Sequence, residues 1–460
     1  MKANLTLFLI AMALTSVRAG DRVYTAEQTS NTVSVIDPAT NKYLGSIHLG
    51  EDVPVALSPL YRGELLVHGM GFSPDHKTLD VISIGSNSVT LIDTETNEVK
   101  GKIYVGRSPH EGFFTPNGHE LWVAVRGEDY VSVIDPVQMK EIRRIETANG
   151  PGMVMFRPDG KYAFVPSSFT PEMDVIDTAT YQVVARQVQA SPFSPNLAVD
   201  QDEVWFTLKD SGKTQVFSAK PPFQNLTTLE TGPITNHVAF VDTARGHFAY
   251  ITVGGEDKVL AYTRDVGASA ELVATIKTGD LPHGIWGSGD GSRVYIGLEN
   301  GDAVQAIDTA TNRIIATIPV GQLPQALVYV PGATTDDKGT ANLKPLGAAS
   351  EALHLELVPP EKSGSSAHAS VSINSLGLID NLQIAAIGLE PGKKYMLVLI
   401  GSPEPQGLVV LTAGIGGASI AQTLGPLKHV VTGSQTSPGM KLEVRSGSDG
   451  KGALILKQAE

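Results

Sequence analysis

Residues 293–320 read RVYIGLENGDAVQAIDTATNRIIATIPV, and this stretch decides the fold. It holds runs rich in β-branched residues that are separated by turns at Asn300-Gly301-Asp302 and at 308–312. Asp308 opens the second turn, where its short carboxylate can accept hydrogen bonds from backbone N–H groups one and two residues on. Short strands joined by tight turns predict an antiparallel β-unit.

The same pattern recurs along the chain. A five-residue alternating run that ends in aspartate occupies 33–37, 89–93, 131–135, 173–177 and 304–308. The steps between the aspartates are 56, 42, 42 and 131 residues, and the last step leaves room for two degenerate copies, around 215–218 and 259–263. Seven copies at a period of about 42 residues predict seven four-stranded units.

Four-stranded units of this kind cannot bury both of their faces alone. Stacked around an axis they cover one another, which predicts an all-β fold with a seven-bladed β-propeller at 21–331. The chain enters in the middle of a repeat at 22–24, and the missing inner strand is supplied by 326–329. The first and last segments should therefore share one blade and leave no exposed sheet edge.

The repeats resemble those of the YVTN family of β-propeller proteins. The resemblance rests on 294–296 with 308–312 and 316–321, and on 23–25 with 31–37, and it covers residues 21–331. It implies a propeller, and it implies secreted, periplasmic or surface-layer scaffolds. The same fold also hosts haem, copper and quinone chemistry, so the resemblance does not select a function.

One residue per repeat is expected to face the mouth of the axial channel. Aligning the repeats on their inner strands gives His68, His110, Gly152, Asn196, His237, His283 and Gln325. We predict a ligand-binding site at His68, His110, Asn196, His237, His283 and Gln325. Four of the seven positions are histidine, although the whole chain has only 11.

Besides a site for a small ligand or a partner, the four histidines have two other interpretations. His68, His110, His237 and His283 could hold a transition metal or ligate a haem iron, since neutral imidazole suits these ions. From their order in the sequence we expect two neighbouring pairs on opposite sides of the ring. The alternative is structural, with each imidazole bonding the backbone of a neighbouring blade.

Further candidates are few. Glu111, next to His110, could act as a general base, but a solvated channel carboxylate is the simpler interpretation. The second repeat carries about 14 extra residues within 52–67, and this insertion could form a lid or a partner contact, or it could be neutral. The chain has no nucleophile elbow, Walker loop, zincin or dinucleotide motif, so the sequence favours a binding protein over an enzyme.

Composition changes after the repeats. Residues 332–350 are small and polar and predict a linker. Beyond them Tyr395 is the only aromatic residue, and seven short apolar or alternating runs within 351–460 predict a small β-sandwich domain. The stretch 415–427 could instead contain one short helix.

The N-terminus predicts export. Residues 1–19 resemble a secretory signal peptide, with Lys2 before the apolar run 5–14 and a small residue at Ala19; an uncleaved anchor is the alternative. No other stretch predicts a membrane span, so a periplasmic or extracellular location is expected. A net charge of −13 argues against nucleic acid as a partner, and the absence of cysteine excludes disulfides and thiolate metal sites.

Three functional hypotheses follow. The first is a secreted, non-enzymatic scaffold that binds a small ligand or a protein partner at its channel mouth, with the C-terminal domain as an interaction module. The second is a periplasmic redox or hydrolytic enzyme that uses a metal or haem on the histidine ring. The third is a lactone hydrolase on a similar propeller, which no motif favours.

Overall fold

The computed structural model describes residues 20–50, 63–265, 267–361, 363–375, 379–402, 404–434 and 437–459. The predicted signal peptide at 1–19 and most of the predicted insertion at 52–67 lie outside these residues. Among the described residues, none of the helices has the length and apolar character needed to cross a bilayer.

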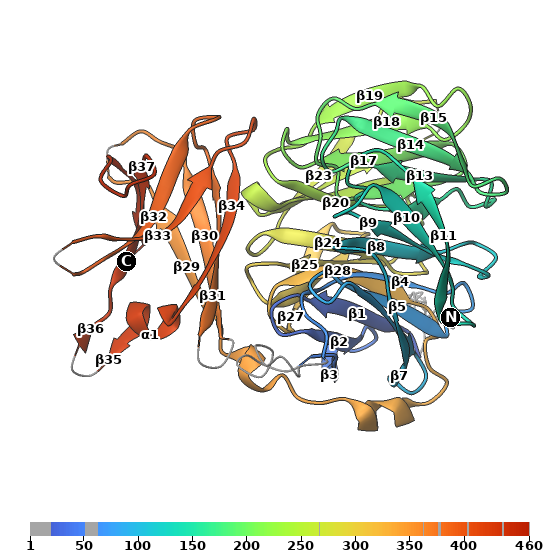
Figure 1. Cartoon of the computed structure of the whole chain (residues 1–460), viewed down its shortest axis with the longest axis horizontal. Helices are drawn as coiled ribbons and strands as arrows, with labels where there is room; N and C mark the ends of the chain where they lie inside the picture. Colours follow the sequence, from blue (N-terminus) through green and yellow to red (C-terminus); the bar gives the residue numbers. More distant parts are fainter. Residues whose placement is uncertain are drawn as a thin grey trace, which may run out of the picture.

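Seven four-stranded antiparallel sheets surround a common axis, so the predicted seven-bladed propeller is confirmed (Figure 1). From the innermost strand outward, the first three blades are β28 (Pro324–Val330), β1 (Arg22–Glu27), β2 (Thr32–Asp37), β3 (Lys42–His48); β4 (Val67–Phe72), β5 (Thr78–Ser83), β6 (Ser88–Asp93), β7 (Val99–Tyr104); and β8 (Pro109–Phe114), β9 (Leu121–Val125), β10 (Tyr130–Asp135), β11 (Lys140–Glu146). The next two blades are β12 (Met155–Phe156), β13 (Tyr162–Pro166), β14 (Glu172–Asp177), β15 (Gln182–Val188); and β16 (Leu197–Val199), β17 (Glu203–Leu208), β18 (Lys213–Ser218), β19 (Asn225–Glu230). The last two are β20 (Thr235–Thr243), β21 (Gly246–Val253), β22 (Lys258–Thr263), β23 (Leu272–Lys277); and β24 (Pro282–Gly287), β25 (Arg293–Leu298), β26 (Ala303–Asp308), β27 (Arg313–Pro319).

The ring closes as the sequence predicts. β28 pairs with β1 in one blade, with Val328 opposite Tyr24. The aspartates that end the third strands shape the turns, although their acceptor bonds reach the backbone N–H groups two or three residues on, such as Ala39 for Asp37 and Thr311 for Asp308. Bulky side chains from neighbouring sheets fill the spaces between blades, which is how each unit buries the faces that it cannot bury alone.

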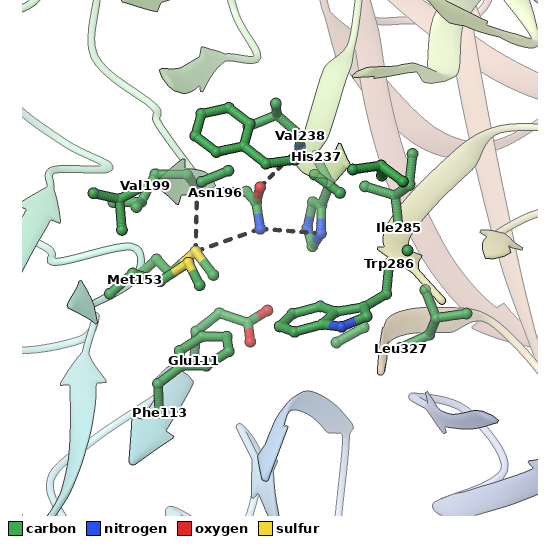
Figure 2. Close-up of a pocket in the computed structure, with 18 of the residues that line it drawn as sticks. Glu111, Phe113, Met153, Asn196, Val199, His237, Val238, Ile285, Trp286 and Leu327 are labelled. Atoms are coloured by element: carbon green, nitrogen blue, oxygen red, sulfur yellow. Dashed lines mark hydrogen bonds between the residues drawn. The ribbon is translucent and has the colours of Figure 1, made fainter. Parts of the chain in front are cut away.

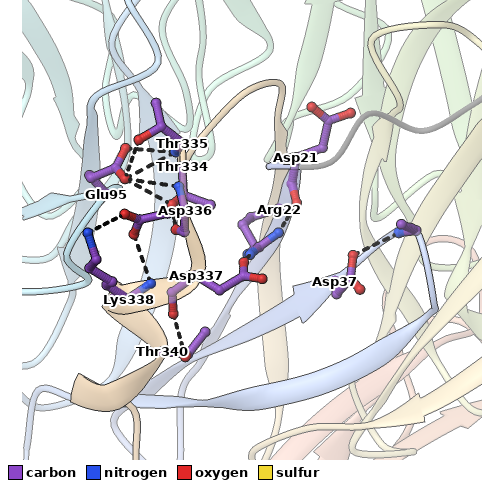
Figure 3. Close-up of polar contacts among 12 residues, drawn as sticks. Asp21, Arg22, Asp37, Glu95, Thr334, Thr335, Asp336, Asp337, Lys338 and Thr340 are labelled. Carbon is purple, nitrogen blue, oxygen red and sulfur yellow. Dashed lines mark hydrogen bonds and ion pairs between the residues drawn. The ribbon is translucent and has the colours of Figure 1, made fainter.

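The segment predicted as a linker lies against the propeller. Backbone and side-chain groups of Thr335 donate to the Glu95 carboxylate, and Asp337 pairs with Arg22 (Figure 3). The short 3-10 turns η3 (Asp337–Asn342) and η4 (Gly347–Ser350) belong to this segment. Residues 334–344 are therefore fastened to the first two blades before the chain continues into the C-terminal domain.

The C-terminal domain is one antiparallel sheet of eight strands. Its order is β33 (Gln406–Thr412), β32 (Lys394–Ile400), β37 (Lys441–Ser446), β38 (Leu454–Gln458), β29 (Leu353–Val358), β30 (His368–Ser375), β31 (Asp380–Ile387) and β34 (Ser419–Gly425). The edge strands β33 and β34 approach each other, so the expected sandwich is a nearly closed, barrel-like sheet around one apolar core. The alternative of a helix within 415–427 is wrong, because β34 takes up Ser419–Gly425 and α1 (Leu427–Thr432) begins only at the last residue of this stretch. The hairpin of β35 (Gly433–Ser434) and β36 (Ser437–Pro438) follows α1.

This sheet covers one mouth of the propeller (Figure 1). Ala385 and Ile387 of β31 pack on Ile234 and Leu281, which precede the inner strands of two blades. The Gln383 amide donates to Glu299 Oε1 and Asn300 Oδ1, both at 2.8 Å. The contact leaves a chamber of about 380 Å³ between the two parts of the chain, lined by Lys209, Glu299 and Gln383 among others.

Candidate functional site

The predicted ring residues all lie at or within three residues of the start of an inner strand. This is the mouth that the C-terminal sheet covers, so the side chains are buried rather than open to solvent. Neighbours in the ring bond one another: His68 meets His110, Asn196 meets His237, and His283 meets the carbonyl oxygen of Gln325.

The four histidines form one continuous cluster. The ring centroids of His68 and His110 lie 4.5 Å apart, those of His237 and His283 also lie 4.5 Å apart, and 6.3 Å separates His68 from His283. The two expected neighbouring pairs are therefore present, but the expectation that they lie apart on opposite sides of the ring is wrong, because His68 and His283 contact each other. The channel is narrow enough at this level for histidines of non-adjacent blades to touch.

Hydrogen bonds fix the protonated nitrogen of three of these rings. A carbonyl oxygen only accepts, so His110 Nδ1 donates to Gly152 at 2.6 Å and His283 Nδ1 donates to Gln325 at 2.9 Å. Asn196 Oδ1 accepts from the Val238 N–H, which turns the Asn196 amide nitrogen toward His237 Nδ1 at 3.2 Å. His237 therefore carries its proton on Nε2, whereas His110 and His283 carry theirs on Nδ1.

All four imidazoles are neutral at physiological pH. Burial holds the pKa of His68, His110 and His237 well below the usual value, and it lowers the pKa of His283 to about 3. The Arg126 guanidinium adds to the effect on the pKa of His68 and His110, and burial lowers the pKa of Arg126 itself to about 10. The cluster thus offers nitrogen lone pairs and N–H groups rather than positive charge.

A second tier of residues at this mouth was missed by the sequence reasoning. Its members directly follow the second strand of each blade, and they are Gln28, Ile84, Arg126, Ser167, Lys209, Gly254 and Glu299. Gln28 contacts His68 at 2.8 Å and Glu299 lies 3.9 Å from His283 Nε2. The sequence contained a signal for this tier. When the repeats are aligned on their inner strands, the charged residues Arg126, Lys209 and Glu299 also fall at equivalent positions, directly after the second strand.

Beneath the histidines, the axial channel widens into a cavity of about 330 Å³ (Figure 2). Its wall is largely apolar and aromatic and includes Phe113, Met153 and Trp286. Asn196 and His237, two buried residues of the predicted ring, lie at its inner end. Asp242 and Gly289 lie at its outer end and are exposed. The cavity therefore opens at the mouth opposite the C-terminal sheet.

Two buried polar atoms at the inner end have no hydrogen-bond partner among the described residues. They are Glu111 Oε1 and His237 Nε2, and both residues line the cavity. Burial raises the pKa of Glu111 well above the usual value, so its carboxyl is protonated, and the interpretation of Glu111 as a solvated carboxylate is wrong. An unpaired buried donor is costly, so such atoms mark a place where a ligand atom or water belongs.

Comparison with known proteins begins with a family. Residues 117–318 match the model of the YNCE-like beta-propellers, and this match and the seven blades are consistent with the predicted YVTN-type propeller. Two curated relatives, both named Protein NirF, come from Stutzerimonas stutzeri and Pseudomonas aeruginosa and are 26% and 27% identical over 120 residues. The match covers 25% of this chain, which spans only about 30% of the length of each of these relatives.

Solved structures with the same fold are numerous. A protein of unknown function from Desulfotomaculum acetoxidans has a TM-score of 0.57 at 11% identity and covers 67% of this chain and 98% of its own. The periplasmic gluconolactonase of Pseudomonas aeruginosa has a TM-score of 0.54 at 17% identity, with 67% and 99% covered. Hydrazine synthase from Kuenenia stuttgartiensis has a TM-score of 0.51 at 19% identity, with 60% and 94% covered. At such identities these likenesses show the fold alone.

Proposed function

We propose that this protein is an exported, non-enzymatic scaffold that binds a small neutral molecule in its axial channel. The ligand has an apolar body and an oxygen acceptor, and it enters through the mouth opposite the C-terminal sheet. One observation carries the proposal: the unpartnered Glu111 carboxyl and His237 Nε2–H converge on the inner end of an otherwise apolar cavity.

The residues that line the cavity determine which chemical groups of a ligand fit it. Both unpartnered groups are donors, because Glu111 is protonated and His237 is held with its proton on Nε2. Among the described residues, no lysine or arginine lines the cavity, so a buried carboxylate or phosphate would have no cation in direct contact with it. The carbonyl oxygen of an amide or ketone that carries an aromatic or aliphatic group can accept from both donors. Burying this neutral group costs less desolvation free energy than burying an anion.

The covered mouth bears on the choice between a protein partner and a small ligand. The C-terminal sheet occupies the histidine end of the channel, and this favours a small molecule over a protein docked on the ring. The C-terminal domain then acts as a lid on the propeller rather than as a separate module. Export is part of the proposal and is supported by the sequence of residues 1–19.

A matched ligand screen tests the proposal. Benzamide-type compounds should raise the thermal unfolding midpoint of the wild-type protein, and each should bind at least about tenfold more tightly than its benzoate counterpart. Val199→Phe, which fills part of the cavity, and Glu111→Gln, which keeps a donor but changes its geometry, should weaken binding by roughly tenfold or more.

Phe169→Ala serves as the control, because Phe169 is exposed and lies outside the cavity wall. It should bind the same compounds as the wild type does. Compounds that stabilise Val199→Phe and the wild type equally would show that they bind elsewhere, and the proposed channel site would then be wrong.

A further inference from the structure

We propose that His68, His110 and Glu111 form a binding site for a divalent transition-metal ion such as zinc, at the inner end of the channel. The proposal uses Glu111 of the cavity wall in its ionised form, since zinc displaces the carboxyl proton when it binds. Zinc and a channel ligand that accepts from the protonated Glu111 carboxyl therefore exclude each other, and the metal site does not require a ligand in the cavity. Of the four histidines predicted as metal ligands it keeps two, and it replaces the others with a carboxylate.

Three potential ligand atoms lie close together. His68 on β4 and His110 on β8 belong to neighbouring blades, and their Nε2 atoms lie 2.9 Å apart. One carboxylate oxygen of Glu111 completes a set of three ligand atoms that all lie within 4.8 Å of one another. All three side chains are buried. Two imidazoles and a carboxylate are a ligand set that suits zinc and other divalent ions of the first transition row.

Hydrogen bonds at the Nδ1 atoms of His68 and His110 decide where the imidazole protons lie. His110 Nδ1 donates to the Gly152 carbonyl oxygen, so its Nε2 carries a lone pair. His68 Nδ1 faces Gln28 Oε1 at 2.8 Å, an acceptor, so its Nε2 carries a lone pair too. Two lone pairs that face each other at 2.9 Å repel unless a positive ion lies between them. Imidazoles whose Nδ1–H donates to an oxygen acceptor are typical metal ligands, because that bond orients the ring.

The Glu111 carboxylate makes few hydrogen bonds and is available as a ligand. Glu111 Oε2 accepts a weak bond from the Met70 N–H at 3.3 Å, and Oε1 has no partner among the residues the structure describes. A glycine makes the close approach possible: a Cβ on Gly69 would lie 2.1 Å from the His110 carbonyl oxygen and 3.0 Å from Glu111 Oε2. β8 thus carries His110 and Glu111, and β4 of the neighbouring blade places His68 against them.

The other two histidines fit the site less well. His237 Nδ1 accepts from Asn196, so Nε2 holds the proton and has no lone pair to offer. His283 Nε2 faces Glu299 at 3.9 Å, and its ring centroid is 6.3 Å from that of His68. The Arg126 guanidinium acts electrostatically on this region and opposes a cation, so we expect micromolar rather than nanomolar affinity.

Gln28, His68 and His110 could also form a different hydrogen-bond network, which leaves no site for a metal ion. Turning the Gln28 amide would place its NH₂ group against His68 Nδ1, so that His68 Nε2 could donate to His110 Nε2. That network is complete without an ion. In this case the protein should bind no metal at these residues.

Calorimetric titration of the full chain with Zn²⁺, after dialysis against a chelator, distinguishes the two arrangements. We expect one zinc ion per chain, with the affinity lowered by roughly 100-fold in His68→Gln or His110→Gln and by at least about tenfold in Glu111→Gln. Co²⁺ in place of zinc should give visible absorption bands that the same substitutions remove. His247→Gln is the control, since His247 is exposed and pairs with Asp242.

Folding of the variants must be separated from loss of the site. Gln28→Leu leaves every proposed ligand in place and should lower zinc affinity by about tenfold without lowering the unfolding midpoint of the metal-free protein. Absence of saturable zinc binding at millimolar concentration would overturn the proposal. So would zinc binding that survives His68→Gln and His110→Gln unchanged in folded protein.

Discussion

Replacing Glu27 with glutamine is expected to raise the stability of the propeller at pH 8 by up to roughly 4 kcal/mol and to leave it nearly unchanged at pH 4.5. Glu27 is fully buried at the end of β1, and burial raises its pKa to about 8. The folded protein therefore holds a proton that the unfolded chain releases near pH 4.5. The stability of the wild type is complete below that pH and is lost as the pH rises through about 8.

Glutamine removes this titration and keeps the hydrogen bonds. Glu27 Oε1 accepts from the Ser34 N–H at 3.2 Å, and Oε2 lies 2.8 Å from Thr32 Oγ1, where an amide NH₂ can donate. Asp302 has a pKa of about 7 and contributes a further decline with pH, which Glu27→Gln should leave in place.

Guanidinium unfolding at pH 4.5 and pH 8 measures the effect, followed by tryptophan fluorescence, because all three tryptophans lie in the propeller. Glu230→Gln is the control, since Glu230 is an exposed partner of Lys213 and should change stability by less than about 0.5 kcal/mol. An unchanged midpoint for Glu27→Gln at pH 8 would mean that Glu27 is already ionised in the folded protein.

Trp122→Ala is expected to destabilise the propeller by about 3–5 kcal/mol. Trp122 on β9 is fully buried between two blades, where it packs edge-on against Phe156 at 5.1 Å and stacks on Tyr181 at 5.8 Å. Its indole N–H donates to Glu120 Oε2, and the Tyr181 hydroxyl donates to the other oxygen of the same carboxylate. The substitution leaves a cavity between blades and removes one of the two donors to Glu120.

Guanidinium unfolding followed by circular dichroism checks this prediction. Trp122→Phe should lose clearly less stability than Trp122→Ala, because the ring contacts remain and only the N–H is lost. Val137→Ala, at a residue that is 89% exposed, should change stability by less than about 0.5 kcal/mol. A loss below about 1 kcal/mol in Trp122→Ala would show that the blades do not depend on this contact.

The repeats were enough to predict the propeller and its ring closure, because each copy repeats the same strand and turn chemistry at nearly constant spacing. Even the degenerate blade around Val259 forms as expected. Its strand β22 lacks the aspartate that opens the turn in other repeats, but it still pairs with β21 and β23. The histidine tier was also readable, because channel-facing positions recur with the same period.

Three features could not be predicted, for physical reasons. The approach of the edge strands β33 and β34, which curls the sheet into a near-barrel, depends on contacts between distant segments, and local patterns do not encode these contacts. The docking of β31 on Ile234 and Leu281 uses ordinary apolar side chains that look like core residues in the sequence. The burial of Glu111 depends on how closely the inner strands of the blades surround the channel, and the sequence of one repeat does not show this distance.

Cysteine labelling of the two ends of the channel tests most directly whether the histidine mouth is closed and the opposite mouth open. The chain has no native cysteine, so single cysteines can be introduced at Met155, on the outer cavity wall, and at Ile234 or Leu281, under the C-terminal sheet. We predict that a bulky maleimide modifies Met155→Cys at least roughly 100-fold faster than Ile234→Cys or Leu281→Cys, because a buried thiol reacts only through local opening. Equal labelling rates at the two ends in folded protein would contradict this account.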